Sequence, residues 1–162
     1  MLNLKKGNLL DWFYIIPIVF LIVLVCVVSL HITNKVDATG IFEDNADADA
    51  NIQQSKATIL LFDNLIMFIV IGLSIFVLVS SYFVWNHPVF FFVGVILLAV
   101  AITLAALFAN SYEQVTNNES LADDAANFVK MNFMMDRFPI YILFMGLMTL
   151  VVMGVSYGKS YG

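Results

Sequence analysis

Four long apolar stretches, each without a charged residue in its core, constrain this chain more than any other feature of its sequence. They cover residues 12–32, 59–84, 89–109 and 138–157; residues 59–64 are a helical extension ahead of the uncharged part of the second stretch. A helix needs about 20 mostly apolar residues to cross the roughly 30 Å hydrocarbon core of a bilayer. Each stretch therefore predicts a membrane-spanning helix.

The composition excludes a soluble protein. Of the 162 residues, 62% are hydrophobic and 12% are charged, against about 45–50% and about 25% in soluble domains. A soluble domain of this size buries only about two-thirds of the surface that its unfolded chain exposes, so the excess apolar surface must face lipid. We predict a single all-α domain over residues 1–162, an integral membrane four-helix bundle built of two span–loop–span hairpins.

The basic residues predict the orientation in the membrane. Three lysines flank the two termini in short segments, and the other four basic residues are spread over two long loops: Lys5, Lys6 and Lys159 against Lys35, Lys56, Lys130 and Arg137. Since the denser basic side stays in the cytoplasm, we expect both termini on the cytoplasmic or equivalent side, and loops 33–58 and 111–137 outside. The first stretch is longer than the apolar core of a signal peptide, so we expect a retained anchor.

Both outer loops contain sequence typical of helices. Residues 46–58 are rich in Ala, Gln and Asp and are expected to prolong the second span into solvent. In the other loop, Ser120 and Asp123 resemble a helix-capping box. Apolar residues follow at helical spacings of three and four: Leu121, Ala125, Phe128, Met131 and Met135. This stripe predicts a helix that lies flat on the membrane surface or folds over the bundle.

Prolines and aromatic residues mark the predicted span ends. The short connection of residues 85–88 predicts a tight hairpin, and Pro88 and Pro139 suit the first turns of the spans that follow them. Aromatic residues with a polar tip favour the membrane–water interface, and seven of them lie near the predicted boundaries: Trp12, Tyr14, Tyr82, Trp85, Tyr112, Tyr141 and Tyr157.

Small residues predict where the spans contact one another, because helices in lipid associate through close backbone approach. The third and fourth spans carry small residues at four-residue spacing: Ala101, Ala105, Ala109, Gly146, Gly154 and Gly158. We expect these spans to touch through those faces, or one face to meet a neighbouring subunit; ordinary packing explains the alanines nearly as well. Asp63 and Arg137 lie at similar depth, and an ion pair between them would join the two hairpins.

The sequence offers little chemistry. His31 and His87 are expected about 30 Å apart, across the bilayer, so they cannot share a metal ion, and Cys26 lies in an apolar run. The acidic run of residues 44–51 lacks the glycine and glutamate of a calcium-binding EF-hand loop. The net charge of −5 argues against nucleic-acid binding. We therefore expect no enzyme activity, no bound cofactor and no metal site.

Two short motifs carry a family resemblance. The turn Asn86-His87-Pro88-Val89-Phe90-Phe91 and the start of the last span, Arg137-Phe138-Pro139, together with the two-hairpin layout, resemble small four-span membrane proteins encoded by viruses. These include proteins of tailless viruses with a membrane beneath the capsid. The resemblance implies a structural or assembly role in a virion or host membrane, and it assigns no catalytic or binding residue.

Three functions stay open at this point. We expect a non-enzymatic structural or assembly subunit, whose partners are the lipid bilayer and either copies of itself or other membrane subunits. The main alternative is a pore, channel or holin-like permeabiliser, which would need the few polar residues of the spans to line a lumen: Ser29, Ser74, Thr103 and Thr149. A third is an accessory subunit of a membrane enzyme complex.

Overall fold

Six helices make up almost all of the described chain. The computed structural model describes residues 10–41, 45–82 and 88–160, and within them it contains no strand. The four long helices are α1 (Leu10–Ala38), α2 (Ala46–Tyr82), α3 (Pro88–Thr116) and α6 (Phe138–Ser160). The short helices α4 (Ala122–Ala125) and α5 (Val129–Asp136) connect α3 to α6. The predicted all-α bundle is confirmed.

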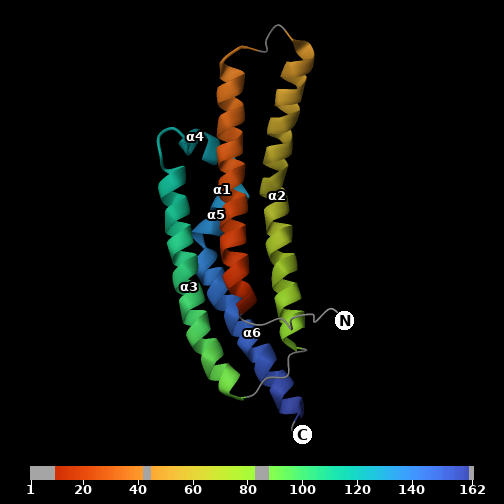
Figure 1. Ribbon diagram of the computed structural model, residues 1–162, viewed down its shortest axis with the longest axis vertical. Coiled ribbons are helices and arrows are strands. Elements are labelled where there is room, and N and C mark those ends of the chain that lie inside the picture. Colours follow the sequence, from red (N-terminus) through yellow and green to blue (C-terminus); the bar gives the residue numbers. More distant parts are fainter. Residues whose placement is uncertain (1–9, 42–44, 83–87, 161–162) are drawn as a thin grey trace.

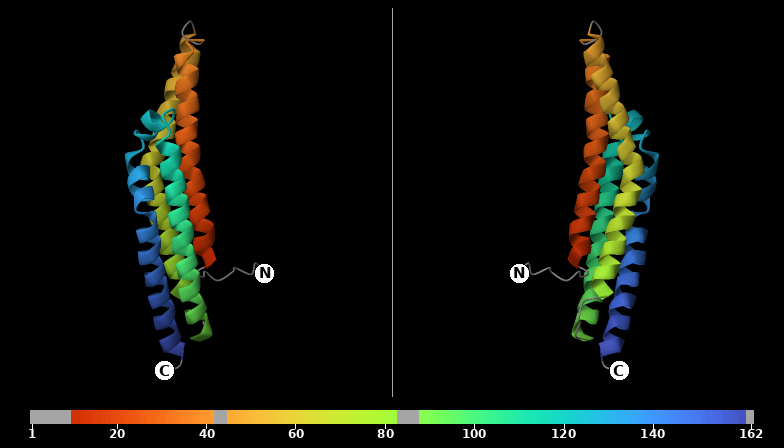
Figure 2. Two further views of the ribbon diagram at one scale, coloured as in Figure 1. Left: turned by 90° about the vertical axis from the view of Figure 1, so that its left-hand side faces the viewer. Right: turned by 90° about the vertical axis from the view of Figure 1, so that its right-hand side faces the viewer.

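The long helices form two antiparallel pairs that pack side by side (Figure 1). Helix α1 packs along α2, and α3 packs along α6; the pairs meet through contacts of α1 with α3 and of α2 with α6. The pairs are shifted along the bundle axis. Helices α1 and α2 extend furthest at one end, and α3 and α6 extend furthest at the other (Figures 1 and 2).

The surface of the bundle is apolar where it would face lipid. In the described residues, four helical segments are long and apolar enough to cross a membrane: Asp11–Ala38, Ala46–Tyr82, Phe91–Thr116 and Phe138–Ser156. Large rings lie on the outside; Phe68 is 74% exposed and Phe92 is 70% exposed. Water around so much apolar surface would be unfavourable, and a bilayer removes that cost. The chain is a multi-pass membrane protein.

Trp12, predicted near a span boundary, has its ring inside the bundle. It is completely buried, and its indole N–H donates a hydrogen bond of 3.4 Å to the hydroxyl of Thr149 in α6. The cause is the shift between the two helix pairs. Because α6 continues past the start of α1 (Figure 2), the first turn of α1 packs against the middle of α6.

The segment predicted as the first outer loop is largely helical. Helix α1 continues through the predicted loop to Ala38, since no helix-breaking residue occurs before Gly40, which takes a φ of 65°. Glycine adopts this left-handed conformation without strain. Helix α2 begins at Ala46, where the side-chain oxygen of Asn45 accepts a 3.2 Å hydrogen bond from the amide of Ala48 as a helix cap. The expected helical extension over residues 46–58 is confirmed, and we call residues 33–38 and 46–58 the outer rod.

The second outer segment folds over the bundle. Helix α3 runs on to Thr116, beyond its predicted end, and α4 and α5 follow. The apolar stripe lies in the core: four of its residues are at most 2% exposed, and Leu121 is half-buried, which matches folding over the bundle rather than lying flat on the membrane surface. We call residues 117–137 the α4–α5 segment.

The predicted capping box is wrong. The side-chain oxygen of Asn118 accepts hydrogen bonds from both the amide and the hydroxyl of Ser120, at 3.0 and 2.7 Å. The Ser120 hydroxyl is thus used before α4 begins, and Leu121 occupies the cap position without a side-chain hydrogen bond. Pro88 and Pro139 do fall in the first turns of α3 and α6. The connection at residues 85–87 lies outside the described residues.

Candidate functional site

The buried carboxylate of Asp63 holds the start of α5. Its Oδ1 accepts hydrogen bonds from the amides of Lys130, at 3.0 Å, and Met131, at 2.8 Å. These are the second and third residues of α5, whose own capping residue, Phe128, makes no side-chain hydrogen bond. A carboxylate at this position satisfies amides that the helix leaves unpaired and interacts favourably with the positive end of its dipole. Asp63, on α2, is thus a helix cap supplied by a different helix.

The expected ion pair between Asp63 and Arg137 is not found among the described residues. The guanidinium of Arg137 lies instead over the ring of Phe133, 4.1 Å from its centroid. Both residues are near the junction of the hairpins, as the sequence suggested. The carboxylate instead accepts hydrogen bonds from two backbone amides of α5.

Buried hydrogen bonds also connect α3 to the α4–α5 segment. The hydroxyl of Tyr112 donates a 2.6 Å hydrogen bond to the side-chain oxygen of Asn132, whose amide nitrogen donates a 2.9 Å bond to the carbonyl of Ala125. Tyr112 is 3% exposed, so it does not serve as an interfacial residue with a solvated tip. It fixes α5 against the end of α3.

A further pair of hydrogen bonds connects the α4–α5 segment to α1. The carboxylate of Asp124 accepts a hydrogen bond from Nδ1 of His31, at 2.6 Å, and another from the side chain of Asn34, at 2.5 Å. Sequence reasoning took His31 as an isolated polar tip and missed this contact. The spacing of His31 and Asn34 places both side chains on one helix face and could have predicted a shared polar contact there. It could not have predicted which residue they contact.

One ion pair links the two helices of the outer rod. The ammonium of Lys56 lies 2.5 Å from the carboxylate of Asp37, and both side chains are partly exposed. Asn34, at the base of the rod, bonds Asp124 of the α4–α5 segment, and beyond that contact α1 and α2 extend past the other helices (Figure 1). The rod's acidic side chains Asp47 and Asp49 lie in the first turn of α2, where they interact favourably with the positive end of the helix dipole.

The four polar residues considered as a pore lining do not share one face. Ser74 is buried, and its hydroxyl bonds the hydroxyl of Tyr141 on α6. Thr149 is buried, and its hydroxyl accepts a hydrogen bond from the indole N–H of Trp12. Thr103 is exposed on the outside of α3 and donates to its own helix. Ser29 lies half-buried between α1 and α2.

The small residues of the third and fourth spans divide between the inside and the outside. Ala101 and Ala105 are buried, and Ala109 is half-buried against the core. Gly146 packs against Leu98 of α3 so closely that a methyl group there would clash with the leucine.

Gly154 differs from Gly146 because it faces outwards with nothing within 4 Å of an added methyl group. Gly158 is part of α6, but its surroundings lie outside the described residues. The glycine row of α6 therefore leaves the α3 interface as it approaches the end of the helix.

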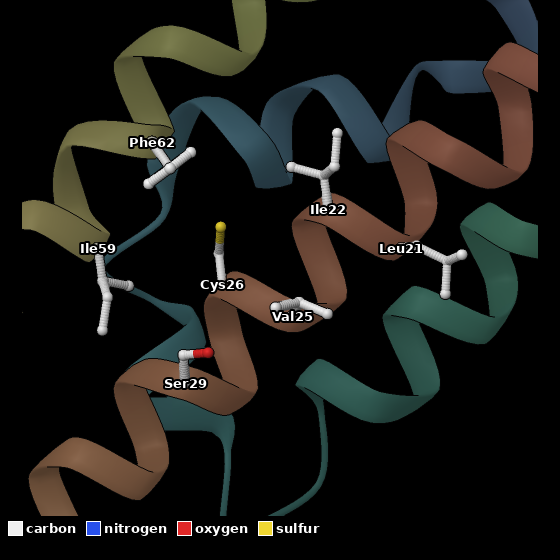
Figure 3. A pocket seen from close by; sticks show the side chains of 7 residues that line it. All are labelled: Leu21, Ile22, Val25, Cys26, Ser29, Ile59 and Phe62. Atoms are coloured by element: carbon white, nitrogen blue, oxygen red, sulfur yellow. The ribbon is translucent and has the colours of Figure 1, made fainter.

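Two apolar cavities of about 370 Å³ each open on the sides of the bundle. The first lies between α1 and α2 and contains the thiol of Cys26 and the hydroxyl of Ser29 among apolar side chains (Figure 3). The second lies between α2, α5 and α6 and includes Arg137. Within the described part of the chain, no three His, Cys, Asp or Glu side chains gather closely enough to hold a metal ion. His87 lies outside that part.

Comparison with protein-family models, with curated proteins and with solved structures finds no match to this chain.

Proposed function

We propose that this chain is a non-enzymatic structural or assembly subunit of a larger membrane or virion complex. The observation that carries the proposal is Gly154, which lies on the outward face of α6 with open space around it. An exposed glycine in a helix is about 1 kcal/mol less favourable than alanine, and in the described part of the chain no atom lies close enough to use the near approach that it permits.

In lipid, such a residue is typical of a face that receives a second helix, because small residues let helix backbones approach closely. Gly158 follows at the spacing of a G-x-x-x-G motif. The partner on this face is another copy of the chain or another membrane subunit. The resemblance to small four-span viral proteins favours an assembly role in a virion or in the membrane of an infected host.

The use of the polar side chains favours assembly over permeation. Ser74 and Thr149 bond side chains on neighbouring helices of the same chain, and Thr103 bonds the backbone of its own helix. A water-filled lumen requires polar groups that face it. The hydroxyls of these three residues instead form hydrogen bonds within the bundle.

The test compares two outward glycines. We expect the wild-type protein, extracted in mild detergent, to run as an assembly in native gels and to co-purify with a stable set of chains. Gly154→Leu should reduce the assembled fraction about tenfold without unfolding the subunit. Gly72→Leu, which also has open surroundings but lies on α2, is the matched control and should leave assembly unchanged.

Three results would contradict the proposal. The first is a monodisperse monomer that carries no partner, and the second is unchanged assembly of Gly154→Leu. The third is rapid dye leakage from liposomes that hold the purified protein, which would favour the pore.

A further inference from the structure

The cavity between α2, α5 and α6 has the composition of a site for an amphiphile. Its walls are apolar and come from all three helices: Met67, Val70, Ile71, Phe133, Met134, Ile140, Tyr141 and Phe144. Its volume of about 370 Å³ is within the size of small-ligand pockets. Several wall residues are half or more exposed, including Ile140 and Phe144, so the cavity is open to the lipid around the bundle.

One cationic side chain faces this apolar space. Arg137 lines the cavity and lies directly before the membrane-spanning part of α6. Its guanidinium stacks on Phe133, and among the described residues no carboxylate is within ion-pairing distance of it. Stacking on a ring fixes the plane of the guanidinium and leaves its N–H groups available for an anion.

A second cation, Lys130, is the second residue of α5, which ends directly before Arg137. Lys130 is exposed and its ammonium contacts the side-chain oxygen of Asn64, a neutral group. The nearby carboxylate of Asp63 is taken up by the backbone amides of α5. The exposed Asp136 forms no ion pair with Arg137 within the described residues.

We propose that this cavity binds one anionic phospholipid. The Arg137 guanidinium holds the phosphate, with Lys130 adding positive charge at the outer end, and an acyl chain lies along Ile140, Phe144 and Ile71. Arginine binds phosphate oxygens with two parallel hydrogen bonds, and the bilayer that surrounds the bundle supplies the lipid. A helix of another protein would use the apolar walls and bring no anion to Arg137. A free fatty acid would pair its carboxylate with the guanidinium but carries no glycerol headgroup to extend towards Lys130.

The test is lipid binding to the purified full-length protein in detergent, followed by native mass spectrometry. Phosphatidylglycerol and phosphatidylcholine with the same acyl chains are added separately, and oleate is the third ligand. Both lipids carry the phosphate, but the choline ammonium of phosphatidylcholine is repelled by Arg137 and Lys130, so we expect the first phosphatidylglycerol to bind about tenfold more tightly than phosphatidylcholine. Arg137→Gln should abolish that preference, whereas Lys35→Gln, which removes an exposed lysine at the end of α1, should preserve it.

A second variant tests the apolar wall. Ile71→Trp fills the cavity from α2 and should weaken the binding of both phospholipids at this site by a similar factor, so it decides the question even if Arg137→Gln does not fold. Equal affinity for the two phospholipids would overturn the proposal. So would an unchanged preference in Arg137→Gln, unchanged binding in Ile71→Trp, oleate that competes as well as phosphatidylglycerol, or a co-purifying protein that excludes lipid from the site.

Discussion

The two segments predicted as outer loops are similar in length, yet one continues α1 and α2 beyond the rest of the bundle as the outer rod, and the other, the α4–α5 segment, packs on the bundle (Figure 1). The rod has Ala, Asp, Asn and Gln through residues 46–58 and no apolar stripe. The α4–α5 segment has buried apolar residues at helical spacing, with Phe128 at its centre. Local helix propensity is enough for a helix that continues a long span, whereas helices of four and eight residues are marginal alone and depend on contacts with the rest of the fold.

The largest effect should come from removing the centre of the α4–α5 segment. Phe128→Ala deletes a completely buried ring and should lower the free energy of unfolding by about 3–5 kcal/mol, measured by thermal or denaturant unfolding in detergent. Val129→Ala is the control, since Val129 is 68% exposed and its loss should change stability by less than about 0.5 kcal/mol. Equal effects of the two would mean that the segment does not pack as described.

The next effect should come from the cap that α2 supplies. Asp63→Ala leaves two amides of α5 without an acceptor and should cost about 2 kcal/mol, seen as faster hydrogen exchange over residues 129–136. Asp63→Asn keeps one carbonyl acceptor and should lose less. The control is Asp47→Ala, on the exposed rod, which should leave hydrogen exchange in α5 unchanged. If hydrogen exchange in α5 of the Asp63→Ala protein were as slow as in the wild type, Asp63 would not be a cap of α5.

A smaller effect should come from the hydrogen bonds that connect the α4–α5 segment to α1. Asp124→Ala removes the acceptor for His31 and Asn34 and should destabilise the segment by about 1–2 kcal/mol. The adjacent Asp123 is exposed, and Asp123→Ala is therefore the matched control. The rate of hydrogen exchange over residues 118–128 should rise in Asp124→Ala but not in Asp123→Ala. A similar rise in both variants would mean that the loss of a local charge, rather than the loss of the hydrogen bonds to α1, causes the effect.

The smallest effect should come from the outer rod. Lys56→Gln breaks the partly exposed pair with Asp37 and should cost about 0.5 kcal/mol or less. Circular dichroism should show no loss of helix. If this substitution melted residues 46–58, the rod would depend on tertiary contacts as the α4–α5 segment does, and the contrast between the two would disappear.

The sequence predicted the spans and the stripe because both are local patterns. Hydrophobic length reveals a spanning helix, and the spacing of Phe128 and Met131 reveals a buried face without knowledge of the partner. Even the rod was partly visible, although its α1 half was missed because Thr33 and Asn34 are polar without breaking the helix.

The polar partners could not be predicted in the same way. A carboxylate such as Asp63 can bind a guanidinium or the free amides at a helix start, and only the position of α5 against α2 decides between them. The contact of Asp124 with His31 joins residues that are 93 positions apart. The burial of Trp12 depends on the shift between the helix pairs, which no single span encodes.

The outer rod also has a mechanical consequence. From Ala46 to Ile59 the helix advances about 20 Å, and a second helix braces it along part of that length (Figure 1). A paired helical post of this kind resists bending far better than a loop would. The start of α2 at Ala46 is therefore held at a fixed distance from Ile59, further along the same helix.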